Sequence, residues 1–306
     1  MGTWIKRIVM ILLLAVFLGS GGVVISILHQ YRVSQKLYDK TAERFVTVRT
    51  AEPTGGEASP AASVISEGVS QEAAAASTLS PAPGADSPDT PAGPARSPEL
   101  APFQVDFEAL RAEGPDVVGW IYCEGTIINY PVVQGEDDDY YLHRSYDGSY
   151  NFPGSIFVEA LNAPGFADYN TIIYGHNMKD NSMFSVLEDW QSQSFYDQHP
   201  VMWLLTPEQD YKIELISGYT TSAGSEAYQL FYGPGADLDV YLHNAMAKSD
   251  FQAAAEPEAG ARYVMLSTCA YVFSNARYVL HGMLRPVSSA GGVPLSQRGN
   301  ESTDGW

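Results

Sequence analysis

Eight short runs rich in β-branched and aromatic residues lie between Phe103 and Pro286, separated by Gly, Pro and Asn. Such runs are typical of β-strands, because these side chains fit a pleated, half-buried surface. The predicted strands cover residues 117–122, 127–133, 155–158, 171–174, 201–206, 211–219, 262–267 and 278–284. Short strands with few long helices predict a mainly β fold, a closed or nearly closed barrel.

Three helical segments are expected around these strands. Residues 105–111 (VDFEALR) form a short amphipathic helix before the first strand. Ser182 to about Trp190 places three large apolar side chains on one face. Asp237 to about Lys248 does the same and precedes the last two strands. These segments add helices to the barrel without changing the fold class.

The N-terminal region contains an uncharged apolar run from Ile8 to Leu28. As a helix it is roughly 30 Å long, which matches the hydrocarbon core of a bilayer. A cleavable signal peptide is the alternative, because Gly19 to Gly22 supplies small residues after a short apolar stretch. We favour an uncleaved anchor, since apolar residues resume at Val23.

Composition divides the rest of the chain. From about Thr50 to Pro102 the residues are mainly Ala, Pro, Ser, Gly and Glu, with no aromatic residue. Such a segment buries too little apolar surface to offset its chain entropy, so a disordered spacer is expected. The expected divisions are a membrane anchor at 1–30, a juxtamembrane segment and spacer at 31–102, a folded domain at 103–286 and a flexible tail at 287–306.

Charge and cysteine content exclude several classes of function. The formal net charge of −19 argues against nucleic-acid binding, which needs clustered Lys and Arg. The two cysteines, Cys123 and Cys269, are too few for a disulfide framework or a four-thiolate metal site. The acidic run from Glu136 to Asp139 lacks the spacing of a calcium loop and is interpreted as a solvated turn. No metal site is predicted.

Cys269 ends a predicted strand, where a rigid scaffold exposes a reactive group. Antiparallel pairing with the next strand would set Arg277 beside it. A guanidinium there favours the thiolate and offers hydrogen bonds to a developing oxyanion. The alternative is a buried structural thiol and a surface arginine. Cys123 lies within a predicted strand (WIYCEG) and is interpreted as a small apolar residue of the core or the surface.

His176 follows the strand TIIY through Gly175 and is also displayed at a strand end. A cysteine nucleophile needs such an imidazole for proton transfer. The other histidines fit less well. His281 lies roughly 13 Å along the strand from Arg277; His243 falls in a helix, His29 at the membrane edge and His199 before a proline. His143 remains a rival.

The segments TIIYGHNMKDNSMF, LSTCAYVFSNARYVLHGML and GWIYCEGTIINYPVVQGEDDDYYLHRSYDG together resemble a class B sortase. The resemblance covers roughly Phe103 to Pro286. It implies an eight-stranded sortase-type β-barrel with N-terminal helices and an extra helix before the penultimate strand. The family's catalytic residues fall on His176, Cys269 and Arg277. Substrate-binding positions fall on Leu142 and Ser267 and, approximately, on Tyr228.

The resemblance implies a membrane-anchored cysteine transpeptidase without a cofactor. Its Cys269 thiolate attacks the Thr carbonyl of a C-terminal sorting signal on a secreted protein, and His176 as imidazolium protonates the departing amine. An amine of a peptidoglycan precursor then releases the thioacyl intermediate. The alternatives are a cysteine peptidase that releases the acyl group to water and a non-catalytic tethered binding module.

The resemblance also implies a single-pass protein of the cell membrane with an extracytoplasmic catalytic domain. The basic residues after the apolar run, taken alone, favour the opposite orientation, because they outnumber the two before it. The spacer is expected to let the domain reach substrates away from the membrane.

Overall fold

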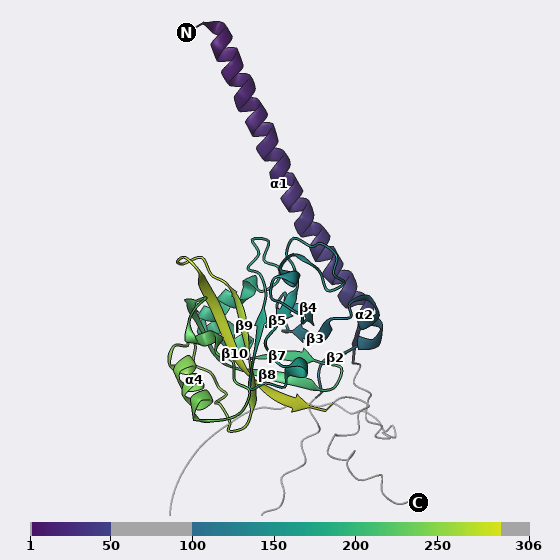
Figure 1. Cartoon of the computed structure of the whole chain (residues 1–306), viewed down its shortest axis with the longest axis vertical. Helices are drawn as coiled ribbons and strands as arrows, with labels where there is room; N and C mark the ends of the chain where they lie inside the picture. Colours follow the sequence, from purple (N-terminus) through teal and green to yellow (C-terminus); the bar gives the residue numbers. More distant parts are fainter. Residues whose placement is uncertain (1, 50–99, 289–306) are drawn as a thin grey trace, which may run out of the picture. The chain divides into compact units, whose positions relative to one another are not determined.

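The barrel expected from the strand pattern is present. The computed structural model describes residues 2–49 and 100–288 (Figure 1). In this part of the chain, eight strands close into a barrel with the order β10-β8-β7-β3-β4-β5-β6-β9. They are β3 (Val117–Tyr122), β4 (Asn129–Val133), β5 (Ile156–Val158), β6 (Asn170–Tyr174), β7 (Val201–Leu205), β8 (Asp210–Ser222), β9 (Arg262–Cys269) and β10 (Ala276–Val287). Each predicted strand overlaps one of these, and the mainly β fold class is confirmed.

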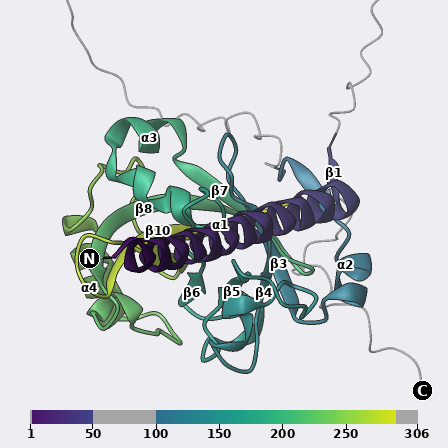
Figure 2. The same ribbon diagram turned by 90° about the horizontal axis from the view of Figure 1, so that it is seen from above.

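Two parallel pairings determine which strand ends meet. β4 runs parallel to β5, and β6 runs parallel to β9, whereas the other neighbours in the barrel are antiparallel. β4, β5 and β6 follow one another along one side of the barrel (Figure 2). Because parallel strands end at the same edge, the residues after β6 and at the end of β9 emerge together.

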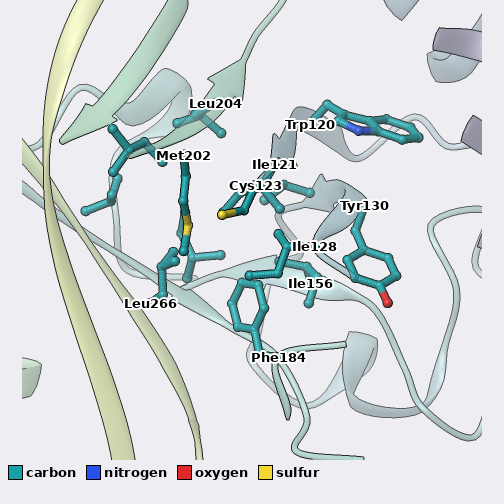
Figure 3. Close-up of a cluster of buried hydrophobic side chains, with 14 of the residues drawn as sticks. Trp120, Ile121, Cys123, Ile128, Tyr130, Ile156, Phe184, Met202, Leu204 and Leu266 are labelled. Carbon is teal, nitrogen blue, oxygen red and sulfur yellow. The ribbon is translucent and has the colours of Figure 1, made fainter. Parts of the chain in front are cut away.

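The barrel core explains the position of the first cysteine. Cys123 directly follows β3 and is fully buried beside Ile121, Ile128 and Met202 (Figure 3). Burial raises the pKa of its thiol to about 12, so the thiol stays protonated. Both cysteines are free. Cys123 is therefore a small core residue.

Two of the three predicted helices form at the predicted residues, and the third does not form. α2 (Phe107–Glu113) begins after Asp106, whose carboxylate accepts the N–H of Ala109 at 3.0 Å. α4 (Ala236–Ala247) packs its apolar face inward and precedes β9, the penultimate strand, as predicted. The predicted helix from Ser182 to Trp190 is wrong. Asn181 and Met183 have φ angles of 61° and 59°, so helical geometry starts later.

In place of that helix, the chain forms the 3₁₀ helix η3 (Ser185–Gln191) and then α3 (Gln193–Gln198). The remaining 3₁₀ turns are η1 (Tyr140–His143), η2 (Pro164–Phe166) and η4 (Glu226–Tyr228).

The N-terminal helix is much longer than the predicted anchor. α1 spans Thr3–Phe45, and its residues 7–26 are all exposed. Beyond them, buried positions recur every three or four residues, at Ser34, Tyr38, Thr41 and Phe45. This spacing places them on one face of the helix. The second half of α1 therefore packs on the barrel.

A two-stranded sheet that the sequence did not predict follows α1. β1 (Val46–Val48) pairs antiparallel with β2 (Phe103–Val105), so residues on both sides of the predicted spacer are adjacent. Residues 50–99 and 289–306, which contain nearly all of the predicted spacer and tail, lie outside the described residues. The predicted domain divisions stay a prediction.

Candidate active site

The β9–β10 hairpin brings a thiol and a guanidinium together. Cys269 is the last residue of β9 and pairs in register with Arg277 on β10. The expected pairing is therefore confirmed. The guanidinium Nη1 donates to the carbonyl of Ala276 at 3.0 Å. Since the guanidinium makes no other hydrogen bond within the described residues, most of its N–H donors remain available to a ligand.

The parallel pairing of β6 with β9 places the imidazole. Tyr174 pairs with Ser267, and the N–H of Gly175 donates to the Ser267 carbonyl at 3.1 Å. Continuing this register by two residues sets His176 beside Cys269. A Cβ at Gly175 would lie 2.5 Å from a methyl carbon of Ile156, so only glycine fits between the strand and His176.

These three side chains line a single pocket. His176, Cys269 and Arg277 are part of the lining of a pocket with a volume of about 230 Å³. The remaining lining residues come from β5, β6, β9 and the segment before β5: Asp138, Asp139, Leu142, Phe157, Tyr174, Gly175, Ser267 and Thr268. A nucleophile, a base and a cationic donor facing one cavity can perform acyl transfer.

A hydrogen bond defines the tautomer of His176. Its Nε2 lies 2.9 Å from the carbonyl oxygen of Leu142, which only accepts, so Nε2 carries a proton. Burial lowers the pKa of His176, and the charges of His143 and Arg277 lower it further against the Leu142 bond. The ring is therefore mainly neutral at pH 7, with the lone pair on Nδ1 free to accept a proton.

The predicted substrate-binding residues are not all at the pocket. Leu142 and Ser267 line it. Tyr228 is not among the lining residues, but its hydroxyl lies 2.8 Å from the Ser267 hydroxyl. Its ring also stacks on Tyr174 at 6.2 Å between centroids. Tyr228 thus supports two residues of the pocket wall.

Asn177 is a residue of the site that was not predicted from the sequence. Its Nδ2 donates to the carbonyl of Cys269 and to Oε2 of Glu188, each at 2.6 Å. The hydroxyl of Tyr271 donates to the Asn177 carbonyl at 3.2 Å. Asn177 therefore joins the loop after β6 to the end of β9. Its position next to His176 in the GHN sequence was the available signal.

The rival histidines fall in different places. His281 is buried, its Nε2 lies 2.9 Å from the Tyr241 hydroxyl, and burial lowers its pKa to about 3. His199 packs on Phe195, and His243 is exposed on α4. None of these lines the pocket among the described residues. His143 is closer, because its ring stacks on that of His176.

The acidic run Glu136–Asp139 forms a turn. Oδ1 of Asp137 accepts the N–H groups of Asp139 and Tyr140 at 3.0 and 2.8 Å, and Asp138 accepts that of Ala160 at 2.8 Å. In residues 2–49 and 100–288, no group of three or more His, Cys, Asp or Glu side chains is placed to hold a metal.

Comparisons with known proteins identify the family. No family model matches the chain. The chain is 33% identical to Sortase B of Staphylococcus aureus over 184 residues. This aligned region covers 60% of this chain and 75% of that protein. The chain belongs to the sortase B family. Sortase B of Listeria monocytogenes is 34% identical over 181 residues, with coverage of 58% and 74%.

Solved structures agree with this family. The crystal structure of Staphylococcus aureus Sortase B matches with a TM-score of 0.56 and 33% identity, covering 60% of this chain and 87% of that one. Clostridium perfringens Sortase B matches with a TM-score of 0.55 and 31% identity, covering 59% and 100%. The resemblance to class B sortases is confirmed, and the chain is an enzyme of a cysteine transpeptidase family. Sortases are membrane-associated, and α1 is a candidate span.

Proposed function

We propose that this sortase cleaves a C-terminal sorting signal after Thr and transfers the secreted protein through Cys269 to a cell-wall amine. The observation that carries the proposal is the single pocket shared by His176, Cys269 and Arg277. Sortase B of Staphylococcus aureus is known in a complex with substrate, and a Sortase B is known in a complex with triglycine. These two complexes support a peptide substrate and an amine acceptor.

The proposed first step is proton transfer from the Cys269 thiol to Nδ1 of His176, which is neutral before reaction. The thiolate attacks the Thr carbonyl carbon, and the carbonyl becomes a tetrahedral oxyanion. Arg277 donates hydrogen bonds to this oxyanion, because its guanidinium N–H groups remain available beside Cys269. The imidazolium then gives its proton to the departing amine, and a thioester remains on Cys269.

The second proposed step reverses these roles. An acceptor amine attacks the thioester carbon, neutral His176 takes the amine proton, and Cys269 leaves to regain its own proton. The products are an amide and the free thiol, so no oxidant, metal or organic cofactor enters the balance. Water attacking the thioester in place of the amine would give the free acid.

We further propose that α1 anchors the enzyme in the cell membrane as a single pass, with the barrel outside the cytoplasm. The exposed apolar half of α1 supports a span. The extracytoplasmic side is supported by the proposed substrates, because secreted proteins and cell-wall amines are found there.

The test is a product analysis with the full chain in detergent. A library of sorting-signal peptides is incubated with and without triglycine, and mass spectrometry identifies the products and any thioacyl adduct on Cys269. We expect amide in the presence of triglycine and an adduct that the Cys269→Ala protein lacks. Free acid as the only product, with triglycine and with cell-wall peptides, would favour a peptidase.

A further inference from the structure

A column of four rings runs from α1 to His176. Tyr31 on α1 contacts Phe152, with ring centroids 5.8 Å apart. Phe152 stacks on His143 at 6.3 Å and an interplanar angle of 14°. His143 in turn stacks on His176 at 5.7 Å and 12°. Three nearly parallel rings therefore end at the imidazole of the pocket.

Backbone hydrogen bonds hold both imidazoles in this column. Nδ1 of His143 donates to the carbonyl of Phe152 at 3.1 Å. Nε2 of His176 donates to the carbonyl of Leu142, the residue that precedes His143 in η1. The same short turn thus supplies the ring that covers His176 and the carbonyl that sets its tautomer.

We propose that His143 is a positioning residue, whose ring, backed by Phe152, fixes the plane of His176 and keeps the proton of neutral His176 on Nε2. The inference rests on the proposed function, because it gives Nδ1 of His176 as the atom that exchanges the proton. A ring turned by half about the Cβ–Cγ bond would bring Cε1 to the Leu142 carbonyl in place of Nε2 and would move Nδ1 to the former place of Cδ2. Nε2–H would then lose its acceptor, and nothing at this carbonyl would favour one neutral tautomer over the other.

The stacking of His143 on His176 also couples the charges of the two rings. His143 is exposed and faces Asp137, Asp139 and Arg144 around a neighbouring pocket, whereas His176 faces Asp138, Asp139, Cys269 and Arg277. Two imidazolium rings stacked at this distance repel one another. A proton on His143 therefore opposes a proton on His176.

The test compares His143→Ala, His143→Phe and the control His243→Phe, which alters an exposed histidine on α4. Histidine is ¹⁵N-labelled in the full chain, and NMR in detergent micelles follows the tautomer and pKa of His176. We expect His143→Ala to mix the two neutral tautomers. His143→Phe should restore the Nε2–H form and raise the His176 pKa by about 0.5 to 1 unit, because the stack remains and the charge is gone.

The control His243→Phe should match the wild type in both the tautomer and the pKa of His176. An unchanged Nε2–H tautomer of His176 in the His143→Ala protein would overturn the proposal. These measurements need no turnover, so they are independent of the product analysis that tests transpeptidation.

Discussion

The two cysteine side chains differ in what surrounds them. Cys123 is enclosed by core residues, whereas Cys269 is half-buried and lines the pocket with His176 and Arg277. We expect Cys269→Ala to reduce transfer by about 1,000-fold or more with little change in stability, because it removes only the nucleophile. The matched Cys123→Ala should keep its rate but lose on the order of 1 kcal/mol of unfolding free energy. Initial rates and thermal unfolding check both, and near-wild-type transfer by Cys269→Ala would refute the mechanism.

Arg277 allows a second test at a single residue. Its guanidinium is planar and offers several N–H donors in a fixed geometry, whereas a lysine ammonium is a point charge. We expect Arg277→Lys to lower kcat/KM by about 100-fold despite the conserved charge. Arg144→Lys is a suitable control, because Arg144 lies outside the lining of the catalytic pocket. Unchanged kinetics in Arg277→Lys would mean that only the charge matters.

At the scale of elements, the strands of the barrel could be predicted because their pattern is local. β3 was predicted at its observed bounds, and the hairpin that pairs Arg277 with Cys269 followed from chain distance. The contacts of Asn177 and His143 could not be predicted, since they join segments far apart in the sequence. The helix predicted from Ser182 failed because tertiary contacts override helical periodicity there: the N–H of Met183 bonds to the Tyr130 hydroxyl.

The junction between β6 and the loop after it depends on one glycine. A Cβ at position 175 would lie 2.5 Å from Ile156 and 2.6 Å from Phe184, whose N–H holds the carbonyl of His176. Gly175→Ala should therefore displace His176, lower transfer at least tenfold and cost about 1–3 kcal/mol of stability. Gly224→Ala is the control, because a Cβ there meets nothing within 4 Å. Wild-type rate and melting temperature in Gly175→Ala would show that the strand end adjusts freely.

For the molecule as a whole, the β1–β2 sheet changes the role expected for the spacer. Val48 pairs with Phe103, and the N–H of Arg49 donates to the carbonyl of Pro102 at 3.1 Å. Because residues on both sides of the intervening segment meet, its length does not set the distance between α1 and the barrel. The connection is instead the packed half of α1, where the Tyr38 hydroxyl donates to the Gly154 carbonyl at 2.5 Å. The β1–β2 sheet therefore does not support the expectation that the spacer lets the domain reach distant substrates.

This packing predicts where the chain can be shortened. A protein that begins at Gln30 loses the exposed apolar half of α1 and should be soluble and folded. One that begins at Ala101 also loses Tyr38 and Phe45, which are only 4% and 3% exposed, and β1. Removal of a buried aromatic side chain costs about 3–5 kcal/mol, and a domain has about 5–15 kcal/mol in total. We therefore expect the shorter protein to melt at a much lower temperature or to aggregate.

The protein that begins at Ala101 lacks both the packed half of α1 and the segment between α1 and the barrel. Replacement of residues 51–97 by a short Gly-Ser linker, in the protein that begins at Gln30, tests which of the two stabilises the barrel. If packing of α1 stabilises the barrel, this protein should melt within a few degrees of its parent, because β1 and β2 can still pair. Circular dichroism melting curves of the three proteins give the comparison. Equal melting temperatures for the proteins beginning at Ala101 and Gln30 would show that the barrel does not depend on α1. A large fall in melting temperature on linker replacement alone would assign the stability to the intervening segment.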